Sequence, residues 1–415
     1  MTLSAAPRAD ELLLSLVNTD EGLQDPYPIY DQLRSGPVRW RTAVGSVVLT
    51  RYDDCLEVLR NPRLGRAEPD MELPQTFGQA QRRRDPDTKT MLFLNPPDHT
   101  RIRSLVSREF TPRRVEHLRA DIESLLAPDL ERLRRAGGGD VMTQVAVPFP
   151  VAVISELLGV PREGNEHIRP LVHAMTSLID AAADGAAREA GLLAAIDLAV
   201  YFADLIEARR EAPDDKLLSA LIRVEAEGDR LSPEELIANT LLLYAAGFET
   251  TSNLIGNGLR LLVRHPDQMD LLRTHPVLAN SAVLEMLRHD SPVQLNVRFA
   301  LEDVELFGEH FGRGTEFVVL QGSANHDPGA FRDPSDFDIR RFTRAESPQP
   351  LSFGWGAHHC LGAHLARAEG EIFFSSLLGV AERIALDPEA IANGGPRYRA
   401  SFTLRGLESL PVRLS

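Results

Sequence analysis

The sequence predicts a mainly α-helical fold with small β-sheets, in one domain that covers all 415 residues. Two observations indicate helices: residues 167–210 are rich in Ala, and a long apolar run follows Ser232. A small sheet is indicated by residues 38–50, which alternate and carry β-branched side chains around Gly45. Because no Ser/Gly-rich or charge-block linker interrupts the chain, we expect a single domain, 1–415.

The composition excludes several classes of protein. A net charge of −15 argues against nucleic acid as a general partner. We expect neither a membrane span nor a signal peptide, since no run of 18 apolar residues occurs and residues 1–10 lack a basic start followed by an apolar stretch. Two cysteines, Cys55 and Cys360, do not suggest a disulfide framework. The protein is therefore expected in the cytoplasm.

In the first hundred residues, the alternating segment 38–50 predicts a β-hairpin. Cys55 lies in a helical pattern that Asn61-Pro62 closes, and we expect it to be a small buried hydrophobe. Residues 66–87 are polar, irregular and rich in proline. A loop of this length inside a compact domain is usually functional or mobile.

A helix start at Asn95-Pro96-Pro97-Asp98 precedes His99 and Arg103, which share one helical face. Two donors on one face can clamp an anion such as a carboxylate. The alternative is an ordinary solvated basic face, because other arginines are nearby. Further helices are predicted over 115–133, ended by the glycines at 137–139, and over 151–158.

The long apolar helix begins with Ser232 as N-cap, and Glu235 completes a capping box. Gly247 disfavours the helix by about 1 kcal/mol relative to Ala. Glu249 places a carboxylate in a buried stretch, which is costly unless it is paired or functional. Small residues at 246 and 247 leave room above the helix, and Thr250 can turn its hydroxyl to the carbonyl one turn back. A packing glycine and a surface glutamate remain the alternative.

Near the C-terminal end, Gly354 and Gly356 let the backbone turn and present Cys360 just before a helical run. A helix N-terminus favours thiolate over thiol, and a thiolate suits a haem iron as its axial ligand. A glycine turn with a buried cysteine is the alternative. Zinc binding by the cysteine and nearby histidines is disfavoured, because no second Cys or His pair lies at the spacing of a structural zinc site.

The order Phe-Gly-x-Gly-x-His-x-Cys-x-Gly, read from Phe353 to Gly362, resembles the haem-binding signature of the cytochromes P450. The strings His-Thr-Arg-x-Arg from His99 and Ala-Gly-x-Glu-Thr-Thr from Ala246 are similar to the propionate-binding helix and the oxygen-binding groove of that family. The resemblance covers essentially the whole chain. It implies the cytochrome P450 fold, with haem between the long central helix and the cysteine loop.

The resemblance also implies the roles of individual residues. Cys360 would be the axial ligand of the haem iron, and Glu249 and Thr250 would relay protons. The residues expected to bind the cofactor are Leu92, His99, Arg103, Ala246, Gly247, Arg298, Ser352, Phe353, Gly354, His358, Gly362 and Ala366. Glu285 and Arg288 would form a structural ion pair that holds Arg340 or Arg341.

For the substrate, the resemblance implies a pocket beneath a lid at 66–87 and beneath the helix pair at 167–210. The expected wall is Leu242, Ala245, Val293, Leu295, Asn296 and Phe402, with Gln294 as a further polar anchor. This wall is mainly apolar and favours a hydrophobic small molecule, such as an intermediate of secondary metabolism.

The family implies a monooxygenase with haem b that inserts one atom of O2 by hydroxylation or epoxidation. Electrons would come from NAD(P)H through a separate ferredoxin and ferredoxin reductase, and we expect a monomer. The alternatives are oxidative coupling, desaturation, a peroxide-driven oxidation, and a catalytically silent haem protein that acts in recruitment or sensing.

Overall fold

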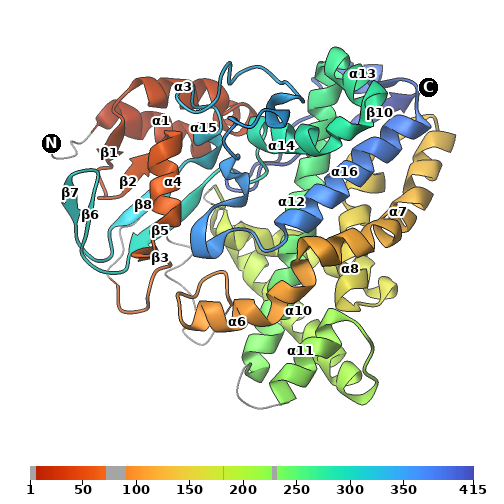
Figure 1. The fold of residues 1–415 in the computed structure, drawn as a ribbon, viewed down its shortest axis with the longest axis horizontal. Helices are drawn as coiled ribbons and strands as arrows, with labels where there is room; N and C mark the ends of the chain where they lie inside the picture. The colour runs from red at the N-terminus through yellow and green to blue at the C-terminus, as the bar shows by residue number, and fades with distance from the viewer. Residues whose placement is uncertain (1–5, 72–89, 181, 227–230) are drawn as a thin grey trace.

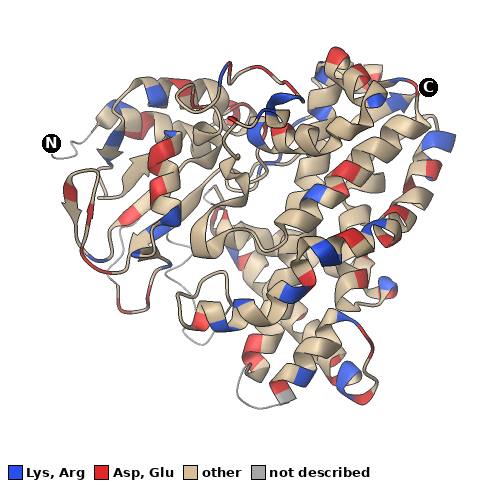
Figure 2. Ribbon diagram, in the orientation of Figure 1, with Lys and Arg blue, Asp and Glu red and all other residues tan. Residues whose placement is uncertain are grey.

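Helices make up most of the molecule, and a small sheet lies towards one end of it (Figure 1). The computed structural model describes residues 6–71, 90–180, 182–226 and 231–415. In Figure 1 the N-terminal elements surround the sheet, and the long helices form the other side. The expected class, mainly α-helical with small β-sheets, is confirmed. Charged residues of both signs are interspersed on the outer helices (Figure 2).

The main sheet has five strands in the order β1-β2-β8-β5-β3. Their bounds are β1 Arg39–Arg41, β2 Val47–Leu49, β3 Leu64–Gly65, β5 Asn296–Ala300 and β8 Glu316–Val319. The hairpin predicted over 38–50 is confirmed, since β1 and β2 pair antiparallel with Trp40 opposite Val48. β5 is antiparallel to both β3 and β8, so the chain that follows β3 lies against β5.

Four helices pack around this sheet: α1 Pro7–Asn18, α2 Asp20–Gln24, α3 Tyr27–Ser35 and α4 Tyr52–Arg60. Cys55 on α4 is buried in an apolar cluster with Val47 and Phe317, as its sequence pattern predicted. The helix ends at Arg60, directly before Asn61. Asn61 has an extended backbone, as expected for a residue that precedes proline.

The helical side begins with α6 Asp98–Val106, α7 Pro112–Arg135, α8 Pro148–Leu158, α9 Asn165–Met175, α10 Gly185–Glu211 and α11 Leu217–Ala226. Short helical turns join them: η1 Ser107–Phe110, η2 Met142–Ala146, η3 Arg162–Gly164 and η4 Thr176–Ile179. The helices predicted over 115–133 and 151–158 are confirmed. α10 starts after Asp184, whose side chain accepts a hydrogen bond from the amide of Ala187 and so caps the helix.

The glycine run at 137–139 does more than end a helix. Gly138–Asp140 forms β4, which pairs with β10 (Pro411–Leu414), and β10 pairs in turn with β9 (Ile384–Leu386). Gly138 has a φ of +125°, and an added Cβ would lie 2.1 Å from the Val412 carbonyl oxygen. This strand was not predicted, because glycines rarely indicate a strand without knowledge of the partner. A further pair consists of β6 (Val304–Leu306) and β7 (Glu309–Phe311).

The central helix is α12, Pro233–Arg264. The predicted capping box is confirmed: the Ser232 hydroxyl accepts from the Glu235 amide, and the Glu235 carboxylate accepts from the Ser232 amide. α12 packs against α8 and α16 (Ala363–Val380), and Figure 1 shows it in the midst of the helical side. The predicted burial of its apolar run is also confirmed, with Tyr244 and Phe248 inside the core.

The remaining elements lead from α12 to the C-terminal end. They are α13 Pro266–Thr274, η5 Pro276–Leu278, α14 Ala279–His289, α15 Gln321–Ala324, η6 Arg341–Thr343, η7 Leu351–Phe353, η8 Gly356–His358 and α17 Pro388–Ala392. A search of the described residues for helices long and apolar enough to cross a membrane finds none.

One buried ion-pair cluster fixes α14 to the chain that precedes the cysteine loop. The Glu285 carboxylate lies 2.8 Å from Arg288 and 3.0 Å from Arg341, and all three side chains are buried. Of the two arginines that the sequence allowed, Arg341 is the partner. Arg340 is exposed and pairs with Asp338. The guanidinium of Arg288 also donates to the carbonyl oxygens of Asn325, Pro334 and Asp336, so it holds two further segments of the chain.

Candidate functional site

The cysteine loop lies between η7 and α16 and has two left-handed glycines. Gly354 and Gly356 have φ values of +65° and +70°. At Gly356 an added Cβ would lie 2.6 Å from the carbonyl oxygen of Leu59, so only glycine fits against α4. The loop closes when the Cys360 amide donates to the Phe353 carbonyl oxygen at 2.8 Å. Cys360 is an exposed residue, whereas Cys55 is buried.

The surroundings of the Cys360 sulfur act on the pKa of its thiol in both directions. Although the residue as a whole is exposed, loss of hydration at the sulfur raises the pKa of the thiol above its usual value, whereas the Gly362 amide and the charge of Arg103 act to lower it. The Gly362 amide at the start of α16 thus acts in the expected direction, and the thiolate state of Cys360 stays a prediction. A cation bound at the sulfur would stabilise the thiolate, since a coordinated thiol is deprotonated outright.

Beside this loop lies a group of four basic side chains, which we call the cationic cradle: Arg66, His99, Arg298 and His358. They come from the segment after β3, from α6, from β5 and from η8. Each has a buried nitrogen that finds no hydrogen-bond partner among the described residues: Nε of Arg66, Nδ1 of His99, Nη2 of Arg298 and Nε2 of His358. Within the described part of the chain, no carboxylate forms an ion pair with any of the four.

The cradle is electrostatically strained. Burial, together with the charges of Arg103, Arg66 and Arg298, lowers the pKa of His99 to about 4. Burial also lowers the pKa of Arg66 to about 10 and that of Arg298 well below its usual value. An uncompensated buried charge destabilises a fold by several kcal/mol. The pattern therefore fits a bound group that carries carboxylates, and the two propionates of a haem meet that requirement.

Of the cradle residues, His99, Arg298 and His358 were predicted and Arg66 was not. Arg66 stands at the start of the expected lid, where nothing in the local sequence distinguishes it from a surface arginine. It reaches the site only because β3 pairs with β5, where its Nη1 donates to the Val297 carbonyl oxygen at 3.2 Å. Most of the expected lid falls outside the described residues. Arg103, also predicted, donates to the His359 carbonyl oxygen at 2.6 Å and so ties α6 to the cysteine loop.

On α12, the open side of the helix is at Ala246 rather than at Gly247. Ala246 is exposed, and its carbonyl oxygen accepts a hydrogen bond from the Thr250 hydroxyl at 3.1 Å, as predicted. An added Cβ at Gly247 would lie 2.8 Å from Cγ1 of Ile154. The glycine thus lets α8 approach, and the expectation that its missing side chain leaves room above the helix is wrong.

Glu249 is buried, and it is paired. Its Oε1 lies 2.6 Å from Arg399 Nη1 and 3.7 Å from His173 Nδ1. Burial acts to raise the pKa of Glu249, but the close contact with His173 and the charge of Arg399 outweigh it, so the pKa is lowered. Neither partner was predicted, because they lie 76 residues before and 150 residues after Glu249 and no motif marks them.

The residues expected around the substrate belong to two apolar clusters. Leu242 and Ala245 pack in the helical core, whereas Leu295 and Phe402 pack beside the main sheet. Val293 forms a bridge with Leu404. Which of these touch a substrate stays a prediction.

The two polar side chains expected at the pocket are both engaged. Gln294 accepts a hydrogen bond from the Tyr30 hydroxyl and donates to the Ser291 carbonyl oxygen, so it is no free anchor and that expectation is wrong. Asn296 accepts from Arg66 and Arg298 through its Oδ1. Asn296 thereby orients two arginines of the cradle.

Other residues predicted near the cofactor have definite places. Ser352 is buried and donates to the Leu287 carbonyl oxygen at 2.6 Å, which fixes the start of the cysteine loop. Leu92, Phe353, Gly362 and Ala366 are half-buried, and nothing lies within 4 Å of a Cβ added at Gly362. Their contact with a cofactor stays a prediction.

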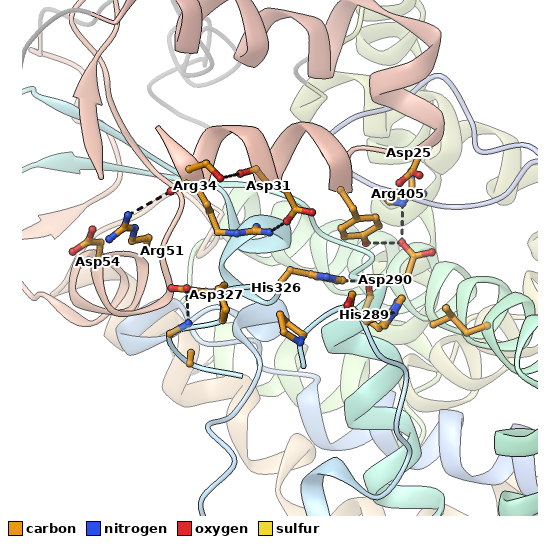
Figure 3. A pocket seen from close by; sticks show the side chains of 18 of the residues that line it. Asp25, Asp31, Arg34, Arg51, Asp54, His289, Asp290, His326, Asp327 and Arg405 are labelled. Atoms are coloured by element: carbon orange, nitrogen blue, oxygen red, sulfur yellow. Dashed lines mark hydrogen bonds and ion pairs between the residues drawn. The ribbon is translucent and has the colours of Figure 1, made fainter. Parts of the chain in front are cut away.

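A separate polar crevice of about 1080 Å³ lies between α3, α14 and the end of α12 (Figure 3). None of the residues predicted for the cofactor lines it. Figure 3 shows Asp290 joined to Arg405 and Arg34 joined to Asp31, so the main buried charges there already have partners. This contrasts with the cationic cradle, and it makes the cradle the candidate site.

Comparison with known proteins supports this assignment. The family "Cytochrome P450" matches residues 193–276 and 268–379. The chain is 39% identical to the polyketide biosynthesis cytochrome P450 PksS of Bacillus subtilis (strain 168), over 89% of each chain. It is 38% identical to the 6-deoxyerythronolide B hydroxylase of Saccharopolyspora erythraea, over 94% of this chain and 96% of that one.

Among solved structures, the fold is similar to that of P450BioI in complex with an acyl carrier protein ligated to hexadec-9Z-enoic acid. The TM-score is 0.84, with 34% sequence identity over 95% of this chain and all of the other. The expected cytochrome P450 fold is confirmed. Fold, cysteine loop and similarity over nearly the whole length agree, and the chain therefore belongs to the cytochrome P450 family of haem-dependent monooxygenases.

Proposed function

We propose that this cytochrome P450 inserts one atom of O2 into a hydrophobic small molecule of secondary metabolism, by hydroxylation or epoxidation. The single observation that carries the placement of the cofactor is the cationic cradle, whose buried nitrogens lack partners within the described part of the chain. The cradle adjoins the loop of Cys360, because the His358 ring belongs to that loop and lies 4.4 Å from the ring of His99.

In this proposal the cradle would hold the haem propionates, and the sulfur of Cys360 would bind the haem iron. Haem supplies the activation of O2 and the transfer of the oxygen atom when it is bound. Arg66, which the sequence did not reveal, joins His99, Arg298 and His358 as a propionate partner. Asn296 and the Val297 carbonyl oxygen orient the two arginines, so the donors are in position before the cofactor binds.

The proton supply is proposed to come from Glu249 and Thr250. The Thr250 hydroxyl lies one turn from the exposed Ala246 and donates to its carbonyl oxygen. It can accept a proton from one side and pass its own to the open side of α12. The Glu249 carboxylate, whose pKa is lowered, is ionised at neutral pH and can take protons from solvent.

The substrate class follows from the expected apolar wall and from two relatives. PksS is named for polyketide biosynthesis, and the hydroxylase of Saccharopolyspora erythraea is named for 6-deoxyerythronolide B. We propose a substrate of similar bulk and polarity. Electrons are proposed to come from NAD(P)H through a ferredoxin and its reductase. The cytoplasmic location, the monomeric state and the single domain stay predictions.

The first test is the absorption spectrum of the reduced protein under carbon monoxide, followed by titration with a library of polyketides, terpenoids and peptide-derived compounds. The expected result is a thiolate-type Soret band, lost in Cys360→Ser, and a ligand that shifts the spin state of the iron. A band typical of histidine or neutral ligation in folded protein would contradict the assignment of Cys360. Turnover with ferredoxin, reductase, NADH and a ligand that binds would separate an active enzyme from a silent haem protein.

A further inference from the structure

Glu249 on the central helix has a cationic partner from the segment 397–407, which we call the C-terminal loop. Its Oε1 lies 2.6 Å from Nη1 of Arg399, and the side chains of Glu249 and Arg399 are 7% and 21% exposed. We infer that Arg399 is a positioning residue for the oxidation, which fixes the orientation and the charge of the Glu249 carboxylate. The inference rests on the proposed role of Glu249 in proton delivery and deepens it.

The guanidinium of Arg399 contacts α12 at two residues that lie one helical turn apart. Nη1 faces the carboxylate of Glu249, and Nη2 donates to Oδ1 of Asn253 at 2.6 Å. Because Glu249 and Asn253 share a helical face, the planar guanidinium spans both without rotation. These two contacts of one guanidinium restrict the orientation of the carboxylate more than a single contact from a flexible cation would.

The backbone of the C-terminal loop is shaped for this contact. The Arg399 amide donates to the Gly406 carbonyl oxygen at 3.0 Å, and the bridge between Tyr398 and Leu407 holds the two arms of the loop together. A Cβ added at Gly406 would lie 1.9 Å from Asn253 Oδ1 and 2.6 Å from Arg399 Nη2. Glycine at 406 is thus what allows the loop to lie against α12 with Arg399 between them.

A second element completes the cluster. His173 on α9 lies 3.7 Å from the carboxylate of Glu249, and its Nδ1 is 3.0 Å from Arg399 Nη1. The His173 side chain is 56% exposed, so the cluster runs from a buried carboxylate to the protein surface. Arg399 therefore links the proposed proton relay to α9, which belongs to the helix pair expected to cover the pocket.

The charge of Arg399 helps to keep Glu249 ionised. Burial alone would raise the pKa of the carboxyl, and the partners reverse this effect. The charged or titratable groups that face Glu249 are Arg399 from the C-terminal loop and His173 from α9, whereas its neighbour Asn253 on α12 is neutral. Without the guanidinium, we expect the pKa of the carboxyl to rise, because a close opposite charge favours the ionised form.

The test compares Arg399→Gln with Arg397→Gln in the holoenzyme. Arg397 belongs to the same loop but is exposed and pairs with Asp20, so it is the matched control. We expect Arg399→Gln to lower the product formed per NADH several-fold with unchanged substrate affinity, and to move the acidic limb of that ratio to higher pH. Arg397→Gln should behave as wild type. Arg399→Lys keeps the charge but cannot contact Glu249 and Asn253 at the same time. It should therefore restore the pH profile more fully than the amount of product formed per NADH.

A second measurement does not depend on turnover. In the diamagnetic carbon monoxide form, the carboxyl of ¹³C-labelled Glu249 is assigned by its loss in Glu249→Gln and is titrated by NMR. Arg399→Gln should raise its pKa, and Arg397→Gln should leave it unchanged. An unshifted titration together with wild-type coupling in Arg399→Gln would overturn the inference. If Glu249→Gln itself leaves coupling intact, the proposed relay fails, and the titration still decides whether Arg399 sets the charge of Glu249.

Discussion

The imidazole rings of His99 and His358 lie 4.4 Å apart, although one comes from α6 and the other from the cysteine loop. Each ring has a buried nitrogen to which no other part of the described structure forms a hydrogen bond. Two arginines complete the group, so four potential cations share a space that no described carboxylate enters. A cluster of this kind opposes folding unless an anion compensates it. We therefore expect that removing one of these cations has opposite effects on the haem-free protein and on the haem-bound protein: it should stabilise the first and weaken haem binding in the second.

Arg66→Ala should stabilise the haem-free protein and weaken haem binding. Without haem, the change removes a buried cation with no counter-ion among the described residues. With haem, it removes a charge-assisted hydrogen bond worth about 1.5–3 kcal/mol, or roughly 10- to 150-fold in the rate of haem loss. Thermal unfolding of both forms and transfer of haem to apomyoglobin measure the two effects.

The control for this prediction is Arg63→Ala, because Arg63 lies three residues earlier, is exposed and pairs with Glu302. It should change neither quantity appreciably. If Arg66→Ala destabilised both forms equally, Arg66 would be a packing residue and not a propionate partner.

Two variants should show which arginine contributes to stability through the ion-pair cluster of α14. Arg341→Ala leaves the buried Glu285 with one partner fewer and should lower the free energy of unfolding by about 3–5 kcal/mol. Arg340→Ala, which removes only an exposed pair with Asp338, should change it by less than about 1 kcal/mol. Urea denaturation of the two variants compares them directly. Equal losses would mean that the contact between Glu285 and Arg341 does not contribute as its burial implies.

The sequence predicted the parts of the site that local pattern encodes. The capping box at Ser232, the turn glycines of the cysteine loop and the bond from Thr250 to the carbonyl one turn back depend on neighbours in the chain. Each was found where it was expected.

The contacts that were missed join distant segments. Arg66 and Arg399 resemble surface arginines in sequence, and only the pairing of β3 with β5 and the return of the C-terminal loop give them their roles. For Gly247, the sequence indicated a position that requires glycine, but it did not indicate the reason. The structure shows that the glycine makes room for the side chain of Ile154.

Gly356→Ala should destabilise the cysteine loop. The new Cβ would lie 2.6 Å from the backbone of Leu59, at a φ of +70° that alanine adopts at a cost of roughly 1–2 kcal/mol. We expect a loss of at least about 2 kcal/mol in stability and a faster loss of haem. Gly379→Ala is the control, because Gly379 is in α16 with open space around it. Alanine there should stabilise the helix by up to about 1 kcal/mol. Similar effects of both changes would contradict the proposed tight contact with α4.

The last prediction concerns the acid stability of the protein. The pKa of Glu249 is lower in the folded protein than its usual value of 4.5, because Arg399 and His173 outweigh burial. The unfolded chain therefore binds a proton at Glu249 at a higher pH than the folded chain does. Stability from this group is fully present above pH 4.5 and is lost as the pH falls through the folded-state value.

Glu249→Gln should flatten that part of the profile of unfolding free energy against pH. The profile is measured by urea denaturation between pH 3 and pH 7, in steps of about half a unit. Asp290→Asn tests a second buried acid, whose pKa is lowered by Arg405 and Tyr398 despite burial. Both buried acids should reduce the acid dependence when neutralised. An unchanged slope in Glu249→Gln would mean that the pair with Arg399 does not persist in solution, and with it the basis for an ionised relay acid would be lost.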